Sequence, residues 1–267
     1  MSAFAAAWLS LREPYDMRAR SPKVMQAVHA ALAGRSSVAI VDLACGTGST
    51  FRALSPHLAA RQDWRLVDND LSLLARAPQS SPPRIQVKAI PIDISRDLEA
   101  ALDGPVDLVT TSALLDLVSQ AWLDRLAIEA AARALPIYAA LTYDGRVELD
   151  PADCADARIV AAVNRHQRSD KGFGPALGPD APTAAVAALA RVGYAVSADA
   201  ADWLFGPDDR EIQTEILIGW ATAARAIGES AAAVIGWLER RRKLVADGRS
   251  SMRVGHRDLF AHPTGTR

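Results

Sequence analysis

The sequence is poor in cysteine and in net charge, and each shortage excludes a class of protein. Only two of the 267 residues are cysteines, Cys45 and Cys154, and they lack the spacing of metal ligands. We therefore expect no disulfide framework and no metal site, and a reducing cytoplasm is the expected location. The 30 basic and 31 acidic residues leave a net charge of −1. This balance argues against nucleic acid or an anionic membrane as a partner.

Long apolar runs are absent as well. No stretch approaches the roughly 20 residues that a membrane-spanning helix needs. The N-terminus is apolar only from Ala3 to Leu9 and has no basic leader, which favours a helix over a signal peptide. In contrast, half of all residues are hydrophobic. A chain of this length and composition can bury the core of one α/β domain with additions.

Short apolar runs alternate with helical patterns along most of the chain. The expected strands cover residues 38–42, 64–68, 84–92, 106–111, 137–143, 194–197 and 251–261. The expected helices include residues 4–11, 50–60, 70–77, 121–135, 183–191, 209–227 and 230–246. Such alternation predicts an α/β fold with a doubly wound parallel sheet and helices on both of its faces.

The most informative motif is Asp-Leu-Ala-Cys-Gly-Thr-Gly at residues 42–48, directly after the first expected strand. Gly46 and Gly48 allow the backbone to approach a nucleotide-like ligand at the end of a parallel strand. Asp42 would repel a pyrophosphate but attract an ammonium group. The dinucleotide fingerprint also fails, because its third glycine position holds the bulky Phe51.

Three further polar positions follow at the ends of the next expected strands. Asp68 can accept hydrogen bonds from both ribose hydroxyls of a nucleoside. Asp93 and Thr111 end the two strands after it. Together with the 42–48 motif, these positions resemble the class I S-adenosylmethionine (SAM)-dependent methyltransferases over residues 38–118. The resemblance covers less than half of the chain, but the order of its parts is more specific than any single part.

The resemblance implies a fold and a division of the chain. The expected fold is a Rossmann-like, doubly wound seven-stranded sheet, mostly parallel with an antiparallel C-terminal strand. Residues 1–36 are predicted to form a helical lid or cap. Residues 37–267 would form the SAM-binding domain, with an inserted segment at about 145–182 and extra helices at about 209–247.

The resemblance also implies SAM as the cofactor. Arg20 would pair with its methionyl carboxylate, Asp93 would accept from the adenine amino group, and Ile94 would cover the ring. The cofactor-binding residues implied in this way are Arg20, Asp42, Ala44, Cys45, Gly46, Gly48, Asp68, Asn69, Asp93, Ile94 and Thr111. Two alternatives stay open: Asp93 can cap a surface helix, and Asp70, a rival to Asp68, is better explained as the N-cap of a helix.

The implied reaction is an in-line methyl transfer to an O or N atom of a small molecule, which can be anionic. Its pocket is expected beyond the strands at 106–111 and 137–143. The candidate catalytic residues are Tyr143, Asp144 and His166, of which His166 is a candidate base. The candidate substrate-binding residues are Asp116, Arg168, Lys171 and Trp203, of which Arg168 and Lys171 suit a carboxylate or phosphate.

Plainer interpretations of the same residues remain. His166 and the basic residues near it are also typical of a solvated helix end, Trp203 of a core, and Asp116 of an exposed helix. Two other functions fit the sequence: a non-catalytic SAM-binding or partner-binding protein, and a methyltransferase that acts on protein or RNA. The sequence leaves the oligomeric state undetermined.

Overall fold

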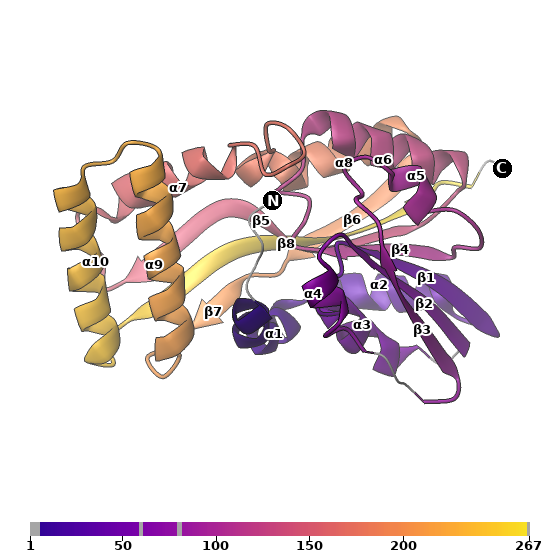
Figure 1. Ribbon diagram of the computed structural model, residues 1–267, viewed down its shortest axis with the longest axis horizontal. Helices are drawn as coiled ribbons and strands as arrows, with labels where there is room; N and C mark the ends of the chain where they lie inside the picture. The colour runs from indigo at the N-terminus through magenta and orange to yellow at the C-terminus, as the bar shows by residue number, and fades with distance from the viewer. Residues whose placement is uncertain (1–5, 59–60, 79–81, 266–267) are drawn as a thin grey trace.

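A single twisted sheet runs through the whole molecule (Figure 1). The computed structural model describes residues 6–58, 61–78 and 82–265. Within these residues eight strands form the sheet, in the order β3-β2-β1-β4-β5-β8-β6, with β7 paired to β8. The strands are β1 (Ser37–Leu43), β2 (Arg61–Asp68), β3 (Ile85–Pro91), β4 (Leu108–Ser112), β5 (Ile137–Asp150), β6 (Tyr194–Ala200), β7 (Trp203–Phe205) and β8 (Ser251–Pro263).

The strand directions confirm the predicted fold class. Strands β1 to β5 are parallel to their neighbours, and β8 is antiparallel to β5, β6 and β7. All seven expected strands are present, so the mostly parallel Rossmann-like sheet with an antiparallel C-terminal strand is confirmed. The short β7 is an eighth strand that the sequence did not predict.

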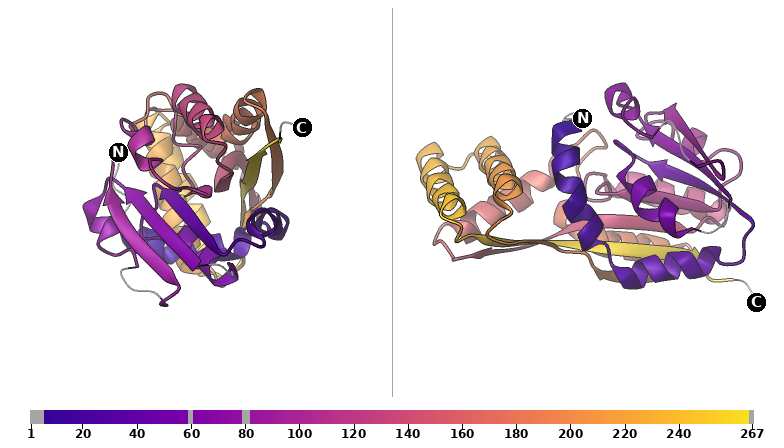
Figure 2. Two further views of the ribbon diagram at one scale, coloured as in Figure 1. Left: turned by 90° about the vertical axis from the view of Figure 1, so that its right-hand side faces the viewer. Right: turned by 90° about the horizontal axis from the view of Figure 1, so that it is seen from below.

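Helices cover both faces of the sheet (Figure 2). They are α1 (Ala6–Ala19), α2 (Pro22–Leu32), α3 (Ser49–Leu54), α4 (Leu71–Leu74), α5 (Leu98–Ala101), α6 (Gln120–Ala132), α7 (Asp156–Gln167), α8 (Ala181–Arg191), α9 (Arg210–Ala226) and α10 (Ala231–Ala246), with 3-10 turns at Ser55–His57 and Gly178–Asp180. One core lies between the sheet and α5, α6 and α8, and a second lies under α2 and α3. Among the described helices, none has the length and apolarity to cross a membrane.

The local sequence explains where α2 begins and which of its faces is buried. The Ser21 side chain accepts a hydrogen bond from the backbone N–H of Val24, and Pro22 occupies the first turn, where its missing N–H costs nothing. Val24, Val28 and Leu32 are spaced four residues apart and are all buried. This apolar stripe fixes α2 against the sheet.

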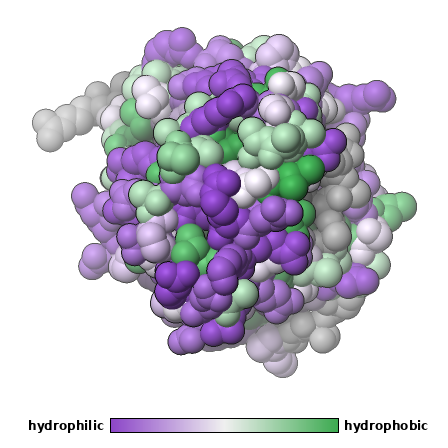
Figure 3. Space-filling model, turned by 90° about the vertical axis from the view of Figure 1, so that its left-hand side faces the viewer, coloured by the Kyte–Doolittle hydropathy of each residue, from purple (hydrophilic) through white to green (hydrophobic). Residues whose placement is uncertain are grey.

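Strands β5 and β8 extend past the strands on either side of them, and an additional layer of helices packs on this extension. Their pairing runs from Ile137–Ala261 to Asp150–Ser251. Helices α7, α9 and α10 pack around this extension on a third core that includes Trp237 and Val254. Seen from outside, this end is covered mainly by polar side chains with scattered apolar ones (Figure 3), so its apolar faces point inward.

The first helix differs most from its expected form. The expected helix at 4–11 ends before Pro14, whereas α1 continues through Pro14 to Ala19; residues 4 and 5 lie outside the described residues. Contacts outside the helix offset the loss of one hydrogen bond at Pro14. Tyr15 packs on Phe205 with ring centroids 5.0 Å apart, and Asp16 accepts a hydrogen bond from the Trp203 indole at 2.9 Å.

Two other boundaries moved. The expected helix at 50–60 is shorter, because α3 ends at Leu54 and a 3-10 turn follows; residues 59–60 lie outside the described residues. The expected strand at 137–143 extends to Asp150 as β5. The predicted lid at 1–36 contains α1 and α2, and its function as a lid stays a prediction.

Candidate functional site

The loop after β1 holds its backbone in a form that favours glycine. Gly46 and Gly48 have φ values of 54° and 84°, and Ala44 has 52°. A Cβ added to Gly48 would lie 2.9 Å from Pro78 Cδ, and one added to Gly46 would lie 3.2 Å from Leu9 Cδ1. The loop is therefore tightly enclosed, and α1 covers it through Leu9.

Asp68, at the end of β2, organises this loop. One of its carboxylate oxygens accepts from the Gly46 N–H at 2.8 Å, and the other accepts from the Asp70 N–H at 3.0 Å. Each oxygen keeps a further lone pair for a ligand. The Asp70 side chain instead accepts from the backbone N–H groups of Ser72 and Leu73. Asp70 is therefore the N-cap of α4, as expected.

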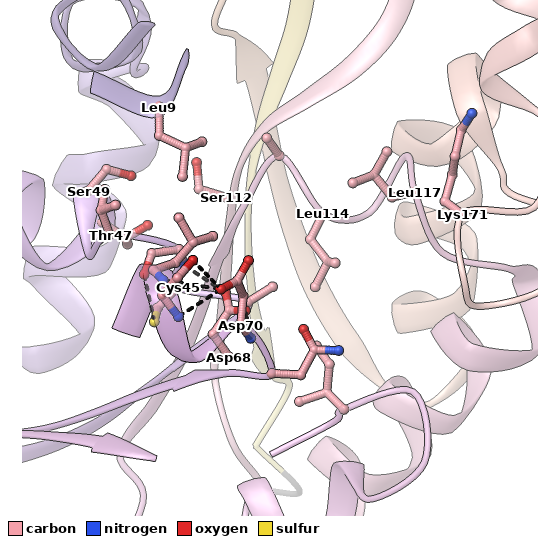
Figure 4. A pocket seen from close by; sticks show the side chains of 18 of the residues that line it. Leu9, Cys45, Thr47, Ser49, Asp68, Asp70, Ser112, Leu114, Leu117 and Lys171 are labelled. Atoms are coloured by element: carbon pink, nitrogen blue, oxygen red, sulfur yellow. Dashed lines mark hydrogen bonds between the residues drawn. The ribbon is translucent and has the colours of Figure 1, made fainter. Parts of the chain in front are cut away.

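A cavity of about 530 Å³ opens beside this loop and is called cavity 1 here. Figure 4 shows Cys45 and Asp68 at one end, and Leu117 and Lys171 at the other. Of the predicted cofactor residues, those that line cavity 1 are Ala44, Cys45, Gly46, Asp68, Asn69 and Ile94. Leu73, Leu114 and Phe173 add apolar surface, and the volume lies in the range of small-molecule sites.

Asp42 and Arg20 lie beneath the loop and do not line cavity 1. Asp42 is fully buried, and burial raises its pKa to about 7. One of its oxygens accepts from the Thr110 hydroxyl at 2.8 Å, while the other has no partner among the described residues. Arg20 is also buried and donates to the Tyr138 hydroxyl at 3.0 Å. Asp42 and Arg20 therefore belong to a set of buried polar side chains that also includes Thr110 and Tyr138.

The other predicted cofactor residues also lie outside the lining of cavity 1. Gly48 begins α3 behind the loop. The Thr111 hydroxyl donates to the Leu43 carbonyl at 3.0 Å. Successive side chains of a strand point to opposite faces, so Thr111 and Ser112 face different ways. Ser112 lines the cavity instead, and the Ser112 hydroxyl is buried with no partner in the described part of the chain. The alternation along β4 could have identified Ser112.

Asp93 occupies a turn after β3. Its carboxylate accepts from the backbone N–H of Ser95 at 3.0 Å and from the Ser95 hydroxyl at 2.6 Å. It does not line cavity 1. The geometry is that of a turn cap. The alternative of a helix cap is not borne out, because α5 begins only at Leu98 with Asp97 at its N-cap position, and the predicted adenine contact of Asp93 stays a prediction.

A second cavity, of about 550 Å³, lies beyond the C-terminal end of β4 and beside Leu141 and Tyr143 in the middle of β5, and we call it cavity 2. The two cavities share Arg12, Ala113, Leu117 and Lys171. We refer to these four residues as the junction. Five predicted acceptor-site residues line cavity 2, namely Asp116, Tyr143, His166, Lys171 and Trp203.

Asp144 and Arg168 lie outside both cavities. Asp144 forms ion pairs with Arg146 at 2.6 Å and with Arg257 at 3.5 Å. Arg168 pairs with Asp180 at 2.9 Å on the exposed side of the inserted segment. Both side chains already have partners of opposite charge, so they have less capacity for a ligand.

Burial shifts the pKa values of the ionisable groups beside the junction. Asp116 is buried, its Oδ1 has no partner among the described residues, and desolvation raises its pKa to about 6. The Lys171 ammonium group donates to the Ser169 hydroxyl at 2.9 Å and to the His166 carbonyl at 3.2 Å. Burial lowers the pKa of Lys171, and burial together with Lys171 lowers the pKa of His166.

The sequence did not single out several residues of cavity 2. Arg12 forms an ion pair with Asp16 at 2.8 Å and lies over the Trp203 ring, 5.3 Å from its centroid. His256 donates from Nδ1 to the Val254 carbonyl at 3.0 Å, since a carbonyl can only accept. Its remaining nitrogen is therefore an acceptor in the neutral ring, and burial lowers its pKa to about 4. Trp8, Arg12 and Asp16 recur every four residues, a helical spacing that could have marked one face of α1.

Metal-ligating side chains do not gather in this region. No group of three or more His, Cys, Asp or Glu side chains comes together within residues 6–58, 61–78 and 82–265. Cys45 and Cys154 are both free.

Comparison with known proteins agrees on the fold. No protein-family model and no curated protein matches the sequence. Among solved structures, the chain is similar to a Bacillus halodurans C-125 protein provisionally assigned as a methyltransferase. The two share 13% identity over 91% of this chain and 100% of that chain, with a TM-score of 0.50.

Two further solved structures are similar at lower TM-scores. One is a SAM-dependent methyltransferase from Thiobacillus denitrificans in complex with S-adenosylhomocysteine, with 14% identity, 98% and 100% of the two chains covered, and a TM-score of 0.45. The other is the cyclopropane synthase MmaA2 from Mycobacterium tuberculosis, with 12% identity, 89% and 82% covered, and a TM-score of 0.47. At such identities the likeness concerns the fold, which is the one that the sequence predicts.

Proposed function

We propose that this protein is a SAM-dependent methyltransferase that binds SAM in cavity 1 and a small methyl acceptor in cavity 2. The observation that supports this proposal most directly is the junction, where two cavities of small-molecule size meet at the C-terminal ends of the parallel strands. In α/β folds of this kind, ligands bind at that edge of the sheet. Two adjoining cavities match a reaction between two bound molecules.

The residues of cavity 1 fit the chemistry of SAM. Asp68 keeps lone pairs for the ribose hydroxyls, and the close-approach loop around Gly46 suits the methionyl part. Ile94 and Leu114 offer an apolar slot for adenine. The unpartnered Ser112 hydroxyl is a further hydrogen-bonding group on the cavity wall.

Bound SAM would supply an activated methyl group on a cationic sulfur, so the protein mainly has to position the two reactants. Leu9 and Phe173, which are far apart in the sequence, both line cavity 1 and would exclude water from it. We propose an O or N atom as the acceptor, since Asp116, Tyr143 and His166 provide polar contacts in cavity 2.

The proposal includes a location and partners. Two free cysteines and a near-zero net charge fit a cytoplasmic protein that acts on a small molecule and not on nucleic acid or a membrane.

Isothermal titration calorimetry with SAM and with S-adenosylhomocysteine tests the cofactor assignment. We expect one site per chain for both compounds, and no heat of binding for NAD⁺ or ATP, whose phosphates Asp42 and Asp68 would repel. If neither SAM nor S-adenosylhomocysteine binds to the intact protein, the proposed function is wrong.

A further inference from the structure

Cavity 2 contains one buried polar atom that lacks a partner. Of the described side chains that line it, only Asp116 has a buried oxygen, Oδ1, without a hydrogen bond. The cationic groups of the same cavity are engaged: Arg12 by Asp16, and Lys171 by Ser169 and His166. A buried polar group without a partner is costly. A ligand of cavity 2 that carries a hydrogen-bond donor would remove this cost if the donor reached Oδ1.

The position of Asp116 places that donor close to the cofactor cavity. Asp116 lies between Ala113 and Leu117, which both belong to the junction. It is 6% exposed. The atom of the acceptor that meets Asp116 therefore lies where the two cavities join, which is the end of the acceptor that would face the methyl group.

The rest of cavity 2 is largely aromatic and apolar. Trp8, Tyr143, Trp203 and Trp220 contribute to its wall, and Ile216 and Val254 are buried beside them. Aromatic faces attract organic cations as well as flat apolar groups. His256 packs on Trp203 with ring centroids 4.7 Å apart and stays neutral at physiological pH, so it adds a further flat surface without charge.

We propose that the acceptor is an amine on an aromatic or similarly flat apolar body, and that its nitrogen donates a hydrogen bond to Asp116. For methyl transfer the bound ammonium group would first give one proton to the Asp116 carboxylate. The freed nitrogen lone pair would then form the new N–C bond while the S–C bond of SAM breaks and S-adenosylhomocysteine leaves. This inference rests on the proposed function and narrows its substrate class from any small molecule to amines. Both an amine and a hydroxyl can donate to Oδ1, but only an amine also gains from the negative charge of Asp116 and from the aromatic wall. An organic anion would instead be repelled by Asp116. Of the two cationic side chains, Arg12 is paired with Asp16, whereas Lys171 donates to the neutral Ser169 hydroxyl and His166 carbonyl.

Three probes with one phenyl body test the class. Phenethylamine, 2-phenylethanol and phenylacetate differ only in carrying an ammonium, a hydroxyl or a carboxylate group. Each is titrated by calorimetry into the protein saturated with S-adenosylhomocysteine, so the readout is binding and not turnover. We expect phenethylamine to bind at least about tenfold more tightly than the other two.

Asp116→Asn and a matched control assign the preference to Asp116. The amide keeps the shape but removes the charge, so the preference for the amine over the alcohol should fall to within about threefold. Glu211→Gln makes the same chemical change at an exposed position of α9 that lines neither cavity, and it should leave the preference intact.

A measurement on the unaltered protein keeps the test independent of folding of the variant. Phenethylamine stays cationic between pH 5 and 8, so its affinity should fall as the pH drops below about 6, where Asp116 takes up a proton. The other ionisable groups that line cavity 2 are Arg12, Tyr143, His166, Lys171, Glu215 and His256. Protonation of His166 would weaken binding over the same range, and Asp116→Asn separates the two because it abolishes only the contribution of Asp116.

The failure of this inference differs from the failure of the proposed function. If S-adenosylhomocysteine does not bind, the proposed function fails. If it binds while phenylacetate is preferred, or while no probe binds at millimolar concentration, the amine assignment alone is wrong. An amine preference that survives in a folded Asp116→Asn protein would also overturn it.

Discussion

Replacement of Asp68 by asparagine tests the cofactor site at the residue on which it depends most. Asp68 accepts from the N–H groups of Gly46 and Asp70, and its two remaining lone pairs are proposed to accept from two ribose hydroxyls. A hydrogen bond to a charged group contributes about 1.5–3 kcal/mol, and two contribute about 3–6 kcal/mol. The amide oxygen of asparagine retains one neutral bond of about 1 kcal/mol.

The difference predicts a loss of about 2–5 kcal/mol in binding free energy, or roughly a 30- to 4,000-fold higher Kd. Calorimetry with S-adenosylhomocysteine measures it. Asp70→Asn is the matched control on the same turn, because asparagine caps a helix about as well as aspartate, and we expect its Kd to stay within about threefold of the unaltered protein. The reasoning is refuted if Asp70→Asn loses affinity while Asp68→Asn does not, since Asp70 would then hold the ribose.

Two further predictions concern buried charges. Arg241 is buried and donates to Asp156 and to the Pro151 carbonyl. Asp156→Ala leaves this guanidinium without its counter-ion, so urea unfolding should show a loss of about 3–5 kcal/mol, and a loss below about 1 kcal/mol would contradict the assigned pairing. Burial raises the pKa of Asp42 from 3.8 to about 7. The folded state therefore retains a proton that the unfolded state releases, and the stability contributed by protonated Asp42 is present below pH 3.8 and lost as the pH rises through about 7. Asp42→Asn should flatten this decline in denaturation curves measured from pH 4 to 8, whereas an unchanged slope would assign the decline to other groups.

Part of the lining of cavity 1 could be predicted because its signals are local. The loop at 42–48 and Asp68 each follow directly after a buried strand, and the parallel sheet brings the ends of those strands together without any help from distant segments. Strand alternation decides the remaining detail. Thr111 points to the Leu43 carbonyl, and Ser112 points to cavity 1, so the sequence identified the correct strand end but the wrong residue.

Two element ends that glycine and proline predict are wrong, because contacts with distant segments override the local preferences of these residues. Gly145 reads as the end of a strand, yet β5 continues to Asp150, because a register shift between Tyr143 and Val147 accommodates the glycine while β8 supplies the paired edge. Pro14 reads as the end of a helix, yet α1 continues past it. With the helix ended early, Arg20 would lie on a flexible segment near the cofactor. In the continued helix, Arg12 reaches the junction and Arg20 lies beneath the sheet.

The sequence named five residues of cavity 2 but missed Trp8, Arg12 and His256, and the reason is topological. The walls of cavity 2 include residues of α1, β5, α7, β7, α9 and β8, and they lie up to 248 residues apart in the sequence, from Trp8 to His256. The contact of Trp203 with Asp16 joins two such distant segments. No local pattern marks His256, whose neutral form arises only when β8 buries it against Trp203 and Tyr143. Asp116 was identified because it lies in the turn that directly follows β4, within reach of the local pattern. Its Oδ1, however, lacks a partner because the distant segments described around it place no hydrogen-bond donor beside it. The cofactor can therefore be inferred from the order of strand ends, whereas the acceptor depends on how the additions at both ends of the chain close around Asp116.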